Sequence, residues 1–554
     1  MSMKNRETLK FISNNIKGCK LKIAILSFAQ IFIGFLTVAF AFFLRFAIDS
    51  LGYIDSKELF IKYTVMLAVL ATLIVLSQIF YHLFYEVSYS DIENKLKNNL
   101  FKTLLSNDYQ EIKKTHDEEW IHRLTSDTAV VASSILNIVP MLCRMVTQLV
   151  LALALVIYLF PIFGLSILPF IVLLILITYF LRKRLKAYHH LVQEKDGKAK
   201  VFISESLQGL SIIHSFVKED IFVKKNEDNL NEYKQARLKR NVFNVICSIS
   251  FLVVYYAFYI LAIVFCGLEM FKNSPDMSVG LLAALLALLT QITGPLGNIT
   301  SIIPKYYTLL ASGERLRIQK DEDVSYLSKQ DIAEYYSNNF KAIDIRKVSF
   351  SYLDKNGNTV EALKDFSLRI NKNERVLIKG HSGGGKTTLF RILLSLIKPN
   401  DGNIYLLDNE ERELDKKYEK LFAYTPQDNL LMEGSIKDVV TLFDEDVDET
   451  QLDKALKISE SKSFVDNLSL KEETFLNEKG SGLSLGEMER IAIARAIYSG
   501  APILLLDECS ASLDAQTEKK VMNNILSMKD KTIILISHHK YDESLFDKVI
   551  DLGE

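Results

Sequence analysis

Residues 376–393 read VLIKGHSGGGKTTLFRIL, which is an apolar run, a glycine-rich turn and then a pattern that favours a helix. Residues 380–387 fit G-x-x-x-x-G-K-[ST], and the expected strand and helix on either side supply the context that this motif requires. The glycines allow successive backbone N–H groups to surround phosphate oxygens, while Lys386 can reach the terminal phosphates and Thr387 is a candidate Mg²⁺ ligand. The alternative is a flexible glycine loop that happens to precede Lys-Thr, and the strand-and-helix context favours the phosphate-binding motif.

A second apolar run, at residues 503–508, reads ILLLDE and ends in two acids. A strand this apolar belongs in the middle of a sheet, so its end faces the glycine turn at the carboxyl edge of the strands. Asp507 would then hold Mg²⁺ through water, and Glu508 could polarise a water for attack on the terminal phosphate. The alternative is that Asp507 and Glu508 merely end the strand and have no role in catalysis. Similar runs alternate with amphipathic helices over residues 341–554, which predicts an α/β P-loop domain with a largely parallel sheet.

The first three-fifths of the chain are far more apolar. The chain has 554 residues, of which 49% are hydrophobic and 24% charged, so two or more domains and a membrane part are expected. A helix needs about 20 apolar residues to cross a bilayer. Six stretches qualify, at residues 21–48, 60–85, 139–160, 162–181, 241–267 and 278–304, with only a turn at Pro161 between the third and the fourth. We expect an all-α transmembrane domain with six helices (1–320), a linker (321–340) and the α/β domain (341–554).

Positive charge predicts the orientation of these spans. The N-terminal tail and residues 182–184 are rich in Lys and Arg, whereas the loops 49–59 and 268–277 carry few. Because cytoplasmic loops carry the excess of Lys and Arg, both termini and the long polar segments 86–138 and 182–240 are expected in the cytoplasm. No cleavable signal peptide and no peptidase domain are evident ahead of the first span, so we expect that this chain does not process a peptide leader itself.

Composition argues against several classes of site and partner. Lys and Arg (66) nearly cancel Asp and Glu (67), so no nucleic-acid partner is expected. The five cysteines are scattered and form no C-x-x-C pair, which argues against a disulfide framework or a zinc site. The abundance of Lys, Ile and Asn suggests a bacterial source, and the six spans then suggest a multi-pass protein of the plasma membrane.

The chain resembles an ATP-binding-cassette (ABC) transporter of the exporter type, in the form of a half-transporter. Tyr352 in VSFSY resembles the aromatic residue that stacks on adenine, residues 380–387 resemble the Walker A loop, and Gln427 in YTPQDNLL resembles the Q-loop glutamine. The remaining family motifs follow in order: LSLGE (483–487) at the signature position, Asp507 and Glu508 as Walker B and catalytic carboxylate, Asp514 in ASLD, and His538 in ISHH. In the first half, HRLTSDT (122–128) and ESLQGLSIIHSF (205–216) resemble cytoplasmic loop motifs of exporters.

The resemblance implies a site for ATP and Mg²⁺. It gives catalytic roles to Glu508, His538, Lys386 and Gln427, and metal ligation to Thr387, Gln427 and Asp507. The residues implied to bind the nucleotide are Tyr352, Gly380, His381, Ser382, Gly383, Gly384, Gly385, Lys386, Thr387, Thr388, Ser484, Gly486, Glu487 and Asp514. Taken singly, Tyr352 could be an ordinary strand aromatic, Gln427 a surface turn residue and His538 a structural cap. His539 has no such role and is expected to face solvent.

The signature sequence departs from the common family form LSGGQ at Leu485 and Glu487. Ser484 and Gly486 are retained, and they supply a hydroxyl and a close approach of the backbone. In the family this turn faces the γ-phosphate held by a second nucleotide domain, so a chain with one such domain must dimerise. A homodimer is favoured over a heterodimer, because the other nucleotide-contacting residues are all present. Glu487 adds negative charge near the nucleotide, which leaves open whether ATP turnover is slower.

The resemblance implies an ATP-hydrolysing exporter that moves a peptide, lipid or drug-like amphiphile out of the cytoplasm by alternating access. Loops near 107–115 and 207–217 would carry closure of the nucleotide domains to the membrane helices. An ATP-gated channel or an ATP-switched sensor with the same architecture is the main alternative. A soluble ATPase regulator is the third, and six spans that follow the positive-inside bias argue against it.

Polar residues inside apolar spans are costly and usually face protein or a water-filled cavity. The candidates are Gln30, Arg45, Gln78, His82, Arg144, Gln148 and Gln291, and Tyr255, Tyr256 and Tyr259 are aromatic candidates for a substrate path. For Arg144 the alternatives are pairing between helices or a place nearer the membrane interface. For the tyrosines the alternatives are packing between helices or an aromatic belt.

Overall fold

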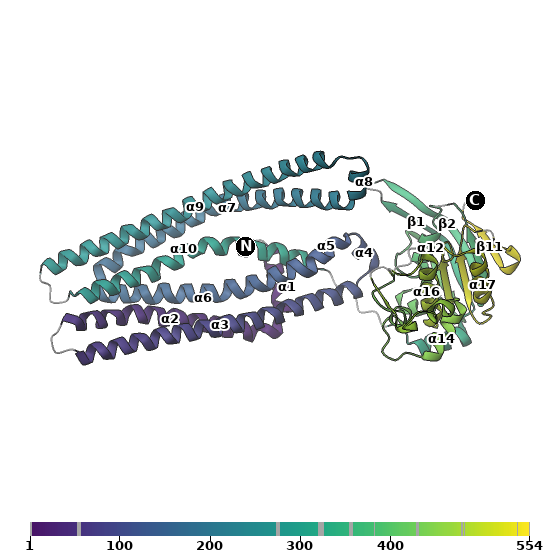
Figure 1. The fold of residues 1–554 in the computed structure, drawn as a ribbon, viewed down its shortest axis with the longest axis horizontal. Coiled ribbons are helices and arrows are strands. Elements are labelled where there is room, and N and C mark those ends of the chain that lie inside the picture. The colour runs from purple at the N-terminus through teal and green to yellow at the C-terminus, as the bar shows by residue number, and fades with distance from the viewer. Residues whose placement is uncertain are drawn as a thin grey trace. The chain divides into compact units, whose positions relative to one another are not determined.

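A computed structural model describes residues 3–52, 57–272, 277–318, 326–353, 358–381, 383–427, 431–477, 480, 482–539 and 541–552. The chain divides into two compact units, Met1–Leu105 with Thr115–Lys320 and Ser106–Lys114 with Asp321–Glu554 (Figure 1). The first unit is built from helices, and the second combines parallel and antiparallel sheets with helices. The predicted fold class, an all-α transmembrane domain followed by an α/β domain, is confirmed.

Long helices make up the first unit. They are α2 (Lys20–Asp49), α3 (Lys57–Ser106), α6 (Thr128–Leu159), α7 (Pro161–Gln208), α9 (Glu219–Phe271) and α10 (Val279–Arg315), with the shorter α1 (Met3–Asn15), α5 (Asp117–His122) and α8 (Leu210–Ser215). Each predicted apolar stretch falls largely within one long helix. Pro161 is the first residue of α7, where its missing N–H costs no hydrogen bond, so α6 and α7 are separated by Phe160 alone.

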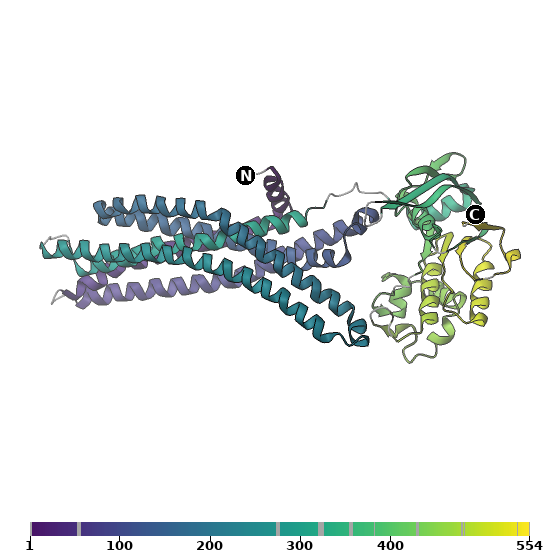
Figure 2. The ribbon, with the colours of Figure 1, turned by 90° about the horizontal axis from the view of Figure 1, so that it is seen from above.

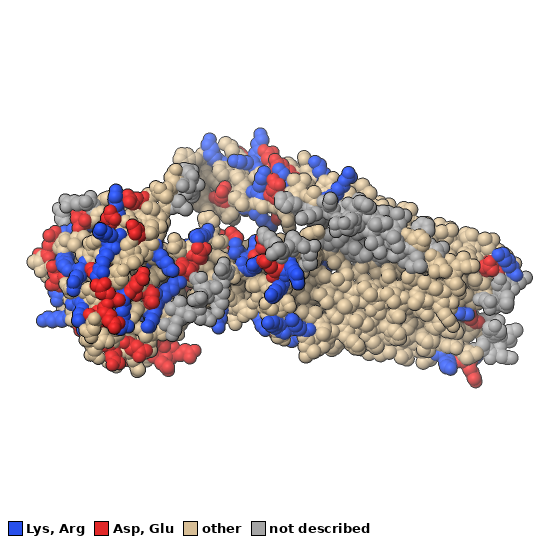
Figure 3. All heavy atoms as spheres, turned by 180° about the vertical axis from the view of Figure 1, so that it is seen from behind, with Lys and Arg blue, Asp and Glu red and all other residues tan. Residues whose placement is uncertain are grey.

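Several of these helices have the length and composition of membrane spans. Four described segments qualify, Lys17–Asp49, Lys57–Ser106, Asp117–Leu159 and Leu252–Phe271, and Val279–Pro295 is a shorter apolar helix. The predicted span 162–181 lies in α7, where most of the side chains are outside the described residues. The six predicted spans are consistent with these helices. Figure 3 shows a broad band without charged side chains over this unit, and exposed apolar residues such as Leu76, Phe80 and Val146 suit contact with lipid.

The helices of the first unit pack as a bundle. Helix α6 packs against α2 and α10, and α7 runs beside α9, as Figures 1 and 2 both show. Polar contacts fix both ends of α10. Asp49 at the end of α2 accepts hydrogen bonds from Ser278 Oγ (2.8 Å) and the Gly280 N–H (2.8 Å). Buried Asp127, in the π-helical turn η3 (Arg123–Asp127), accepts from Arg315 Nε (2.7 Å) at the other end.

The described residues of the second unit form three sheets. The parallel sheet has the order β11-β3-β10-β9-β6, and the others are β2-β1-β4-β5 and β7-β8, both antiparallel. Its strands are β1 (Ala342–Leu353), β2 (Thr359–Asn371), β3 (Arg375–Lys379), β4 (Asp401–Leu407), β5 (Glu411–Glu413), β6 (Phe422–Thr425), β7 (Gly434–Ser435), β8 (Phe475–Leu476), β9 (Ile503–Asp507), β10 (Thr532–Ile536) and β11 (Lys548–Asp551). Its helices are α4 (Tyr109–Lys113), α11 (Lys329–Glu334), α12 (Lys386–Leu393), α13 (Ile436–Thr441), α14 (Glu449–Ile458), α15 (Lys462–Val465), α16 (Leu485–Tyr498) and α17 (Ala515–Leu526).

The parallel sheet separates two apolar cores. Alternate residues of β9 point to opposite faces, so Leu504 joins a core with α16 and α17, and Leu505 joins a core with α12 and β1. This two-sided burial explains why β9 reads as an unbroken apolar run. In the register of the sheet, Ile536 lies beside both Ile378 and Asp507. The loops that follow β3, β9 and β10 therefore leave the sheet at the same edge.

Candidate functional site

The glycine turn between β3 and α12 lies at this edge. Gly380, Gly383 and Gly385 have φ of 141°, 86° and 82°, a region of backbone conformation that glycine adopts without strain. A Cβ atom at Gly385 would also lie 2.1 Å from the Ala362 carbonyl oxygen, so no larger residue fits there. The Gly384 N–H donates to the His381 carbonyl (3.1 Å). Ser382, the remaining predicted residue of the turn, lies outside the described residues.

Lys386 begins α12 and reaches back over the turn. Its Nζ donates to the carbonyls of Gly380 (2.8 Å) and His381 (2.9 Å), and lies 3.3 Å from His538 Nε2. No side chain caps the start of α12, because Gly385 occupies the N-cap position. An ammonium group beside the uncapped N-terminus of a helix attracts an anion, and phosphate is the anion that such glycine turns accommodate.

Thr387 and Asp507 meet beside this turn. Thr387 Oγ1 donates to Asp507 Oδ2 (2.9 Å), and the Tyr424 hydroxyl lies 3.4 Å from the same oxygen. Burial raises the pKa of the Asp507 carboxyl above its usual range. Asp507 Oδ1 is buried and has no hydrogen-bond partner within the described residues. A hydroxyl and a carboxylate oxygen that lacks a partner fit a hard cation such as Mg²⁺.

Glu508 contacts two of the other residues that were predicted to be catalytic. Its Oε2 accepts a hydrogen bond from Gln427 Nε2 (2.9 Å), and its Oε1 lies 3.0 Å from His538 Nε2. Since His538 also approaches Lys386, the four side chains form one continuous chain of contacts. Glu508 has φ of 50°, which is uncommon for a residue with a side chain and is found where surrounding structure enforces it. Its side chain contacts residues of the loops that follow β6 and β10.

Tyr352 lies on β1, near the first turn of α12. Its hydroxyl is 3.3 Å from Thr388 Oγ1 and accepts from Arg391 Nη1 at 3.3 Å. The ring is 37% exposed and packs edge-on against Phe350, with 4.9 Å between ring centroids. A partly exposed tyrosine next to the glycine turn offers a flat surface for a base. The structure therefore brings Tyr352 and Thr388 into contact with each other, and it adds Arg391, which the sequence did not single out.

The signature residues form a cap for their own helix. Ser484 is the N-cap of α16, and its N–H and Oγ both donate to Glu487 Oε2 at 2.8 Å. The Glu487 N–H in turn donates to Ser484 Oγ at 3.3 Å, which completes a capping box. A Cβ atom at Gly486 would lie 3.0 Å from the Ser512 carbonyl oxygen, so the turn also packs closely on the loop after β9. Within the described residues, no hydrogen bond joins Ser484 or Glu487 to the cluster around Lys386.

Asp514 also caps a helix. Its Oδ1 accepts from the backbone N–H groups of Gln516 (3.1 Å) and Thr517 (3.0 Å) at the start of α17. A hydrogen bond from the Thr517 side chain, together with these backbone bonds, lowers the pKa of its carboxyl. Like Ser484, it makes no hydrogen bond to the Lys386 cluster in the described part of the chain. His539 was expected to face solvent; it is exposed, and its Nδ1 also lies 2.7 Å from Glu518 Oε1.

Sequence reasoning missed Glu489. This residue of α16 is only 4% exposed, and both of its carboxylate oxygens lie 3.0 Å from the Ser512 N–H, which donates to them. Burial raises the pKa of its carboxyl. Glu489 therefore ties the signature helix to the loop that leads to Asp514. The available signal was an acid on the face of α16 that also carries Ile493 and Ala496, both of which are buried.

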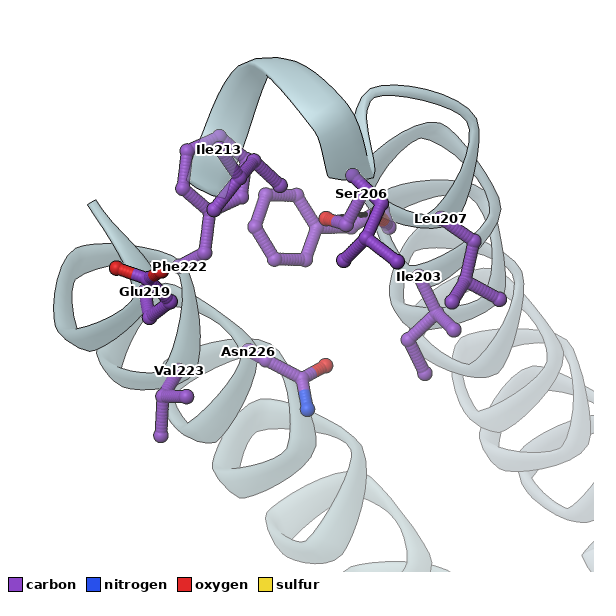
Figure 4. Close-up of a pocket in the computed structure, with 10 residues that line it drawn as sticks. Ile203, Ser206, Leu207, Ile213, Glu219, Phe222, Val223 and Asn226 are labelled. Atoms are coloured by element: carbon purple, nitrogen blue, oxygen red, sulfur yellow. Dashed lines mark hydrogen bonds between the residues drawn. The ribbon is translucent and has the colours of Figure 1, made fainter. Parts of the chain in front are cut away.

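Two segments predicted to transmit movement are also described. Helix α4 lies in the segment 107–115, belongs to the second unit and is preceded by Asp108, which lies 3.5 Å from Lys416 Nζ. The segment 207–217 forms α8 at the tip of the α7–α9 pair. An apolar pocket of about 280 Å³ lies beside α8. Figure 4 shows Leu207 on one side of this pocket and Phe222 on the other.

Comparisons with known proteins agree with this division of the chain. Residues 23–296 match the family model described as ABC transporter transmembrane region, and residues 363–511 match the model described as ABC transporter. A solved structure of a bacterial Atm1-family ABC exporter with ATP bound has a TM-score of 0.79, with 20% identity, over 98% of this chain and 94% of that chain. At that identity the likeness concerns the fold.

Curated relatives extend over different parts of the chain. ABC transporter B family member 1 of Dictyostelium discoideum is 27% identical, over 80% of this chain and 48% of that protein. The lactococcin-A transport/processing ATP-binding protein LcnC of Lactococcus lactis subsp. lactis is 33% identical, over 48% of this chain and 36% of that protein. A provisionally named export ATP-binding/permease protein of Rickettsia bellii is 26% identical, over 96% of this chain and 92% of that protein. The chain thus matches about half or less of the length of the first two relatives.

Proposed function

This chain belongs to the ABC transporter family, and from that premise we propose that it is an ATP-hydrolysing exporter that works by alternating access. The observation that carries the proposal is the contact chain from Lys386 through His538 and Glu508 to Gln427. Four groups suited to phosphate binding and water activation meet at one sheet edge. A phosphate-binding loop alone would support nucleotide binding; the added carboxylate and imidazole support hydrolysis.

Each residue of the site receives a role in this proposal. The glycine turn and Lys386 hold the phosphates, and Tyr352 supports the adenine ring. Mg²⁺, held by Thr387, Asp507 and the free amide oxygen of Gln427, would supply positive charge to the phosphate oxygens. Glu508 accepts a proton from the attacking water, and His538 orients the Glu508 carboxylate through their 3.0 Å contact.

Export requires a second subunit. Ser484, Gly486 and Asp514 belong to turns at the starts of α16 and α17, and we assign them to the ATP held by the partner subunit. ATP can drive closure only because it binds the closed pair of nucleotide domains better than the open pair. A homodimer is the preferred assembly and a heterodimer the alternative. Closure would reach the membrane helices through the segments 107–115 and 207–217.

The proposed cellular setting is a bacterial plasma membrane with the nucleotide domain in the cytoplasm. The excess of Lys and Arg at the N-terminus and at residues 182–184 supports this orientation. The relative LcnC is named for transport and processing of lactococcin-A, which supports peptides as one substrate class. Lipids and drug-like amphiphiles remain alternative substrates of the same architecture.

Replacement of the carboxylate tests the proposal. In protein reconstituted into liposomes, Glu508→Gln should reduce ATP hydrolysis by about 100-fold or more and leave ATP binding intact, because the amide cannot take the proton. The matched control is Glu543→Gln, an exposed acid outside this contact chain that pairs with Lys379. Wild-type protein that passes ions down a gradient without hydrolysing ATP would contradict export and favour an ATP-gated channel.

A further inference from the structure

A polar cavity of about 430 Å³ lies inside the helical bundle of the first unit. Its walls come from α2, α3, α6 and α10, and its polar residues are Gln30, Tyr81, Asn137, Arg144, Gln148, Thr290 and Gln291. Four of these were predicted from the sequence as polar residues within apolar spans. The volume falls in the range of sites for small molecules. Of the other three candidates, Gln78 and His82 are exposed on α3, and Arg45 lies near Asp49.

The cavity has hydrogen-bonding groups to spare. Gln148 Nε2 donates to Thr37 Oγ1 (3.1 Å) and to Gln291 Oε1 (3.0 Å), which holds two of the glutamines in place. Gln30 is 8% exposed, and its Oε1 is buried without a hydrogen-bond partner in the described part of the chain. A buried amide oxygen without a partner is costly. Turning this amide presents a donor or an acceptor to a molecule in the cavity.

Arg144 brings a positive charge to the same cavity. It is half-buried on α6, and no Asp or Glu of the described residues lies within ion-pair distance of it. The sequence shows the same lack of carboxylates along the spans, because none of the six predicted spans contains an acidic residue. Neither this chain nor an identical second copy can therefore offer Arg144 a carboxylate from within a span.

Three described cations near the ends of the helices have acidic partners. Arg45 Nε lies 3.5 Å from Asp49 Oδ2, Lys22 pairs with Asp91, and Arg315 donates to Asp127. Charged groups inside membrane proteins are retained where they have a partner or a function. Arg144 has no such carboxylate among the described residues, so its guanidinium is available to an anion in the cavity.

We infer that this cavity binds an anionic group, a carboxylate or a phosphate, of the transported substrate. The planar guanidinium of Arg144 matches both groups with two parallel hydrogen bonds, and the glutamine amides supply further contacts. Met141 and Met145 also line the cavity and provide an adaptable apolar wall. An amphiphile with an acidic head fits this combination. The inference rests on the proposed exporter function and adds the charge of the substrate to it.

The positions of Arg144 and Gln291 along their helices indicate where in the bundle the cavity lies. Arg144 lies about 7 Å inside the cytoplasmic end of the predicted span 139–160, from a rise of about 1.5 Å per residue. Gln291 lies near the middle of the predicted span 278–304. The cavity therefore occupies the cytoplasmic half of the bundle, where a substrate that awaits export would be collected.

Binding measurements test the inference on the full chain. In dodecyl maltoside, a neutral detergent without phosphate, and without nucleotide, wild-type protein should bind dodecyl phosphate more tightly than 1-dodecanol. Arg144→Gln should weaken dodecyl phosphate binding by about 10- to 100-fold and leave dodecanol binding unchanged. Arg144→Lys should recover part of the affinity, because it restores the charge without the planar fork. Arg45→Gln, the same change at a paired arginine outside the cavity, should leave both affinities unchanged.

Two results would overturn the inference: equal wild-type affinity for the phosphate and the alcohol, or unchanged phosphate binding in Arg144→Gln. If Arg144→Gln does not fold, the wild-type comparison still decides. Phenyl phosphate, added from the aqueous phase, identifies the source of the anion: binding of both phosphates indicates a water-soluble anion, and binding of dodecyl phosphate alone indicates an amphiphile. Because no nucleotide is present, this binding is independent of ATP turnover, so the inference and the exporter proposal fail separately.

Discussion

Two helices of the second unit, α12 and α16, begin with glycine-containing turns, and they differ in whether a side chain caps the first backbone N–H groups of the helix. Helix α12 follows Gly385, has no side-chain cap and carries Lys386 in its first turn. Helix α16 is closed by the capping box of Ser484 and Glu487, so an acidic side chain already occupies its N-terminus. The difference suggests a division of labour. The first turn is ready for phosphate within one chain, and the second can take part only when an incoming phosphate competes with its own carboxylate.

The largest effect is expected at the glycine turn before α12, the open turn, which has no side-chain cap. Lys386→Ala should reduce ATP hydrolysis by about 100-fold or more and weaken ATP binding, because it removes the ammonium from the N-terminus of α12. Hydrolysis and binding of a fluorescent ATP analogue are the measurements. The control is Lys398→Ala, an exposed lysine beyond the end of α12. Near-normal turnover of Lys386→Ala would show that the open turn does not hold the phosphates.

A smaller effect is expected at the turn before α16, the capped turn, which Ser484 and Glu487 close. Ser484→Ala should lower hydrolysis by about tenfold and leave ATP binding to the open turn unchanged, since the lost contact is made only in the closed dimer. The matched control is Ser435→Ala, which removes the same type of capping box, with Asp438, from α13. Equal losses of hydrolysis in the two variants would mean that Ser484 acts only as a helix cap.

The smallest effect is expected from the charge at this turn. Glu487→Gln should lower the KM for ATP by about two- to fivefold, because glutamine keeps the capping geometry and removes a charge that repels phosphate. The gain should shrink at high ionic strength, which screens the charge. Steady-state hydrolysis at two salt concentrations measures both effects, with Asp438→Asn as the control on α13. A raised KM would indicate that the carboxylate assists the nucleotide instead.

Much of the second unit could be predicted from sequence because its functional residues lie in short motifs next to recognisable strands and helices. The apolar run ending in Asp507 and the glycine turn before Lys386 lie at the ends of parallel strands, and such ends share one edge of a sheet. The capping role of Glu487 was also readable, since Ser-x-x-Glu is the spacing of a capping box. The resemblance to transporters directed attention to the nucleotide instead.

Other features depend on packing that sequence spacing does not encode. The contact of His539 with Glu518 joins residues from different elements of the second unit. In the first unit, Gln30, Arg144 and Gln291 come from three helices, and only the packing of α2, α6 and α10 brings them to one cavity. The period of an apolar helix identifies its faces, and it does not identify the neighbour that each face meets.

Cross-linking of the two kinds of turn tests the central claim most directly. The variant lacks the native cysteines and carries Glu508→Gln. One exposed residue of each turn is replaced by cysteine in the same chain, His381→Cys in the glycine turn and Leu485→Cys in the turn at α16. If each turn at α16 meets the glycine turn of a second copy, ATP and Mg²⁺ should produce a disulfide-linked dimer that is absent without nucleotide. A dimer yield that does not change with ATP, or no dimer at all, would contradict the account.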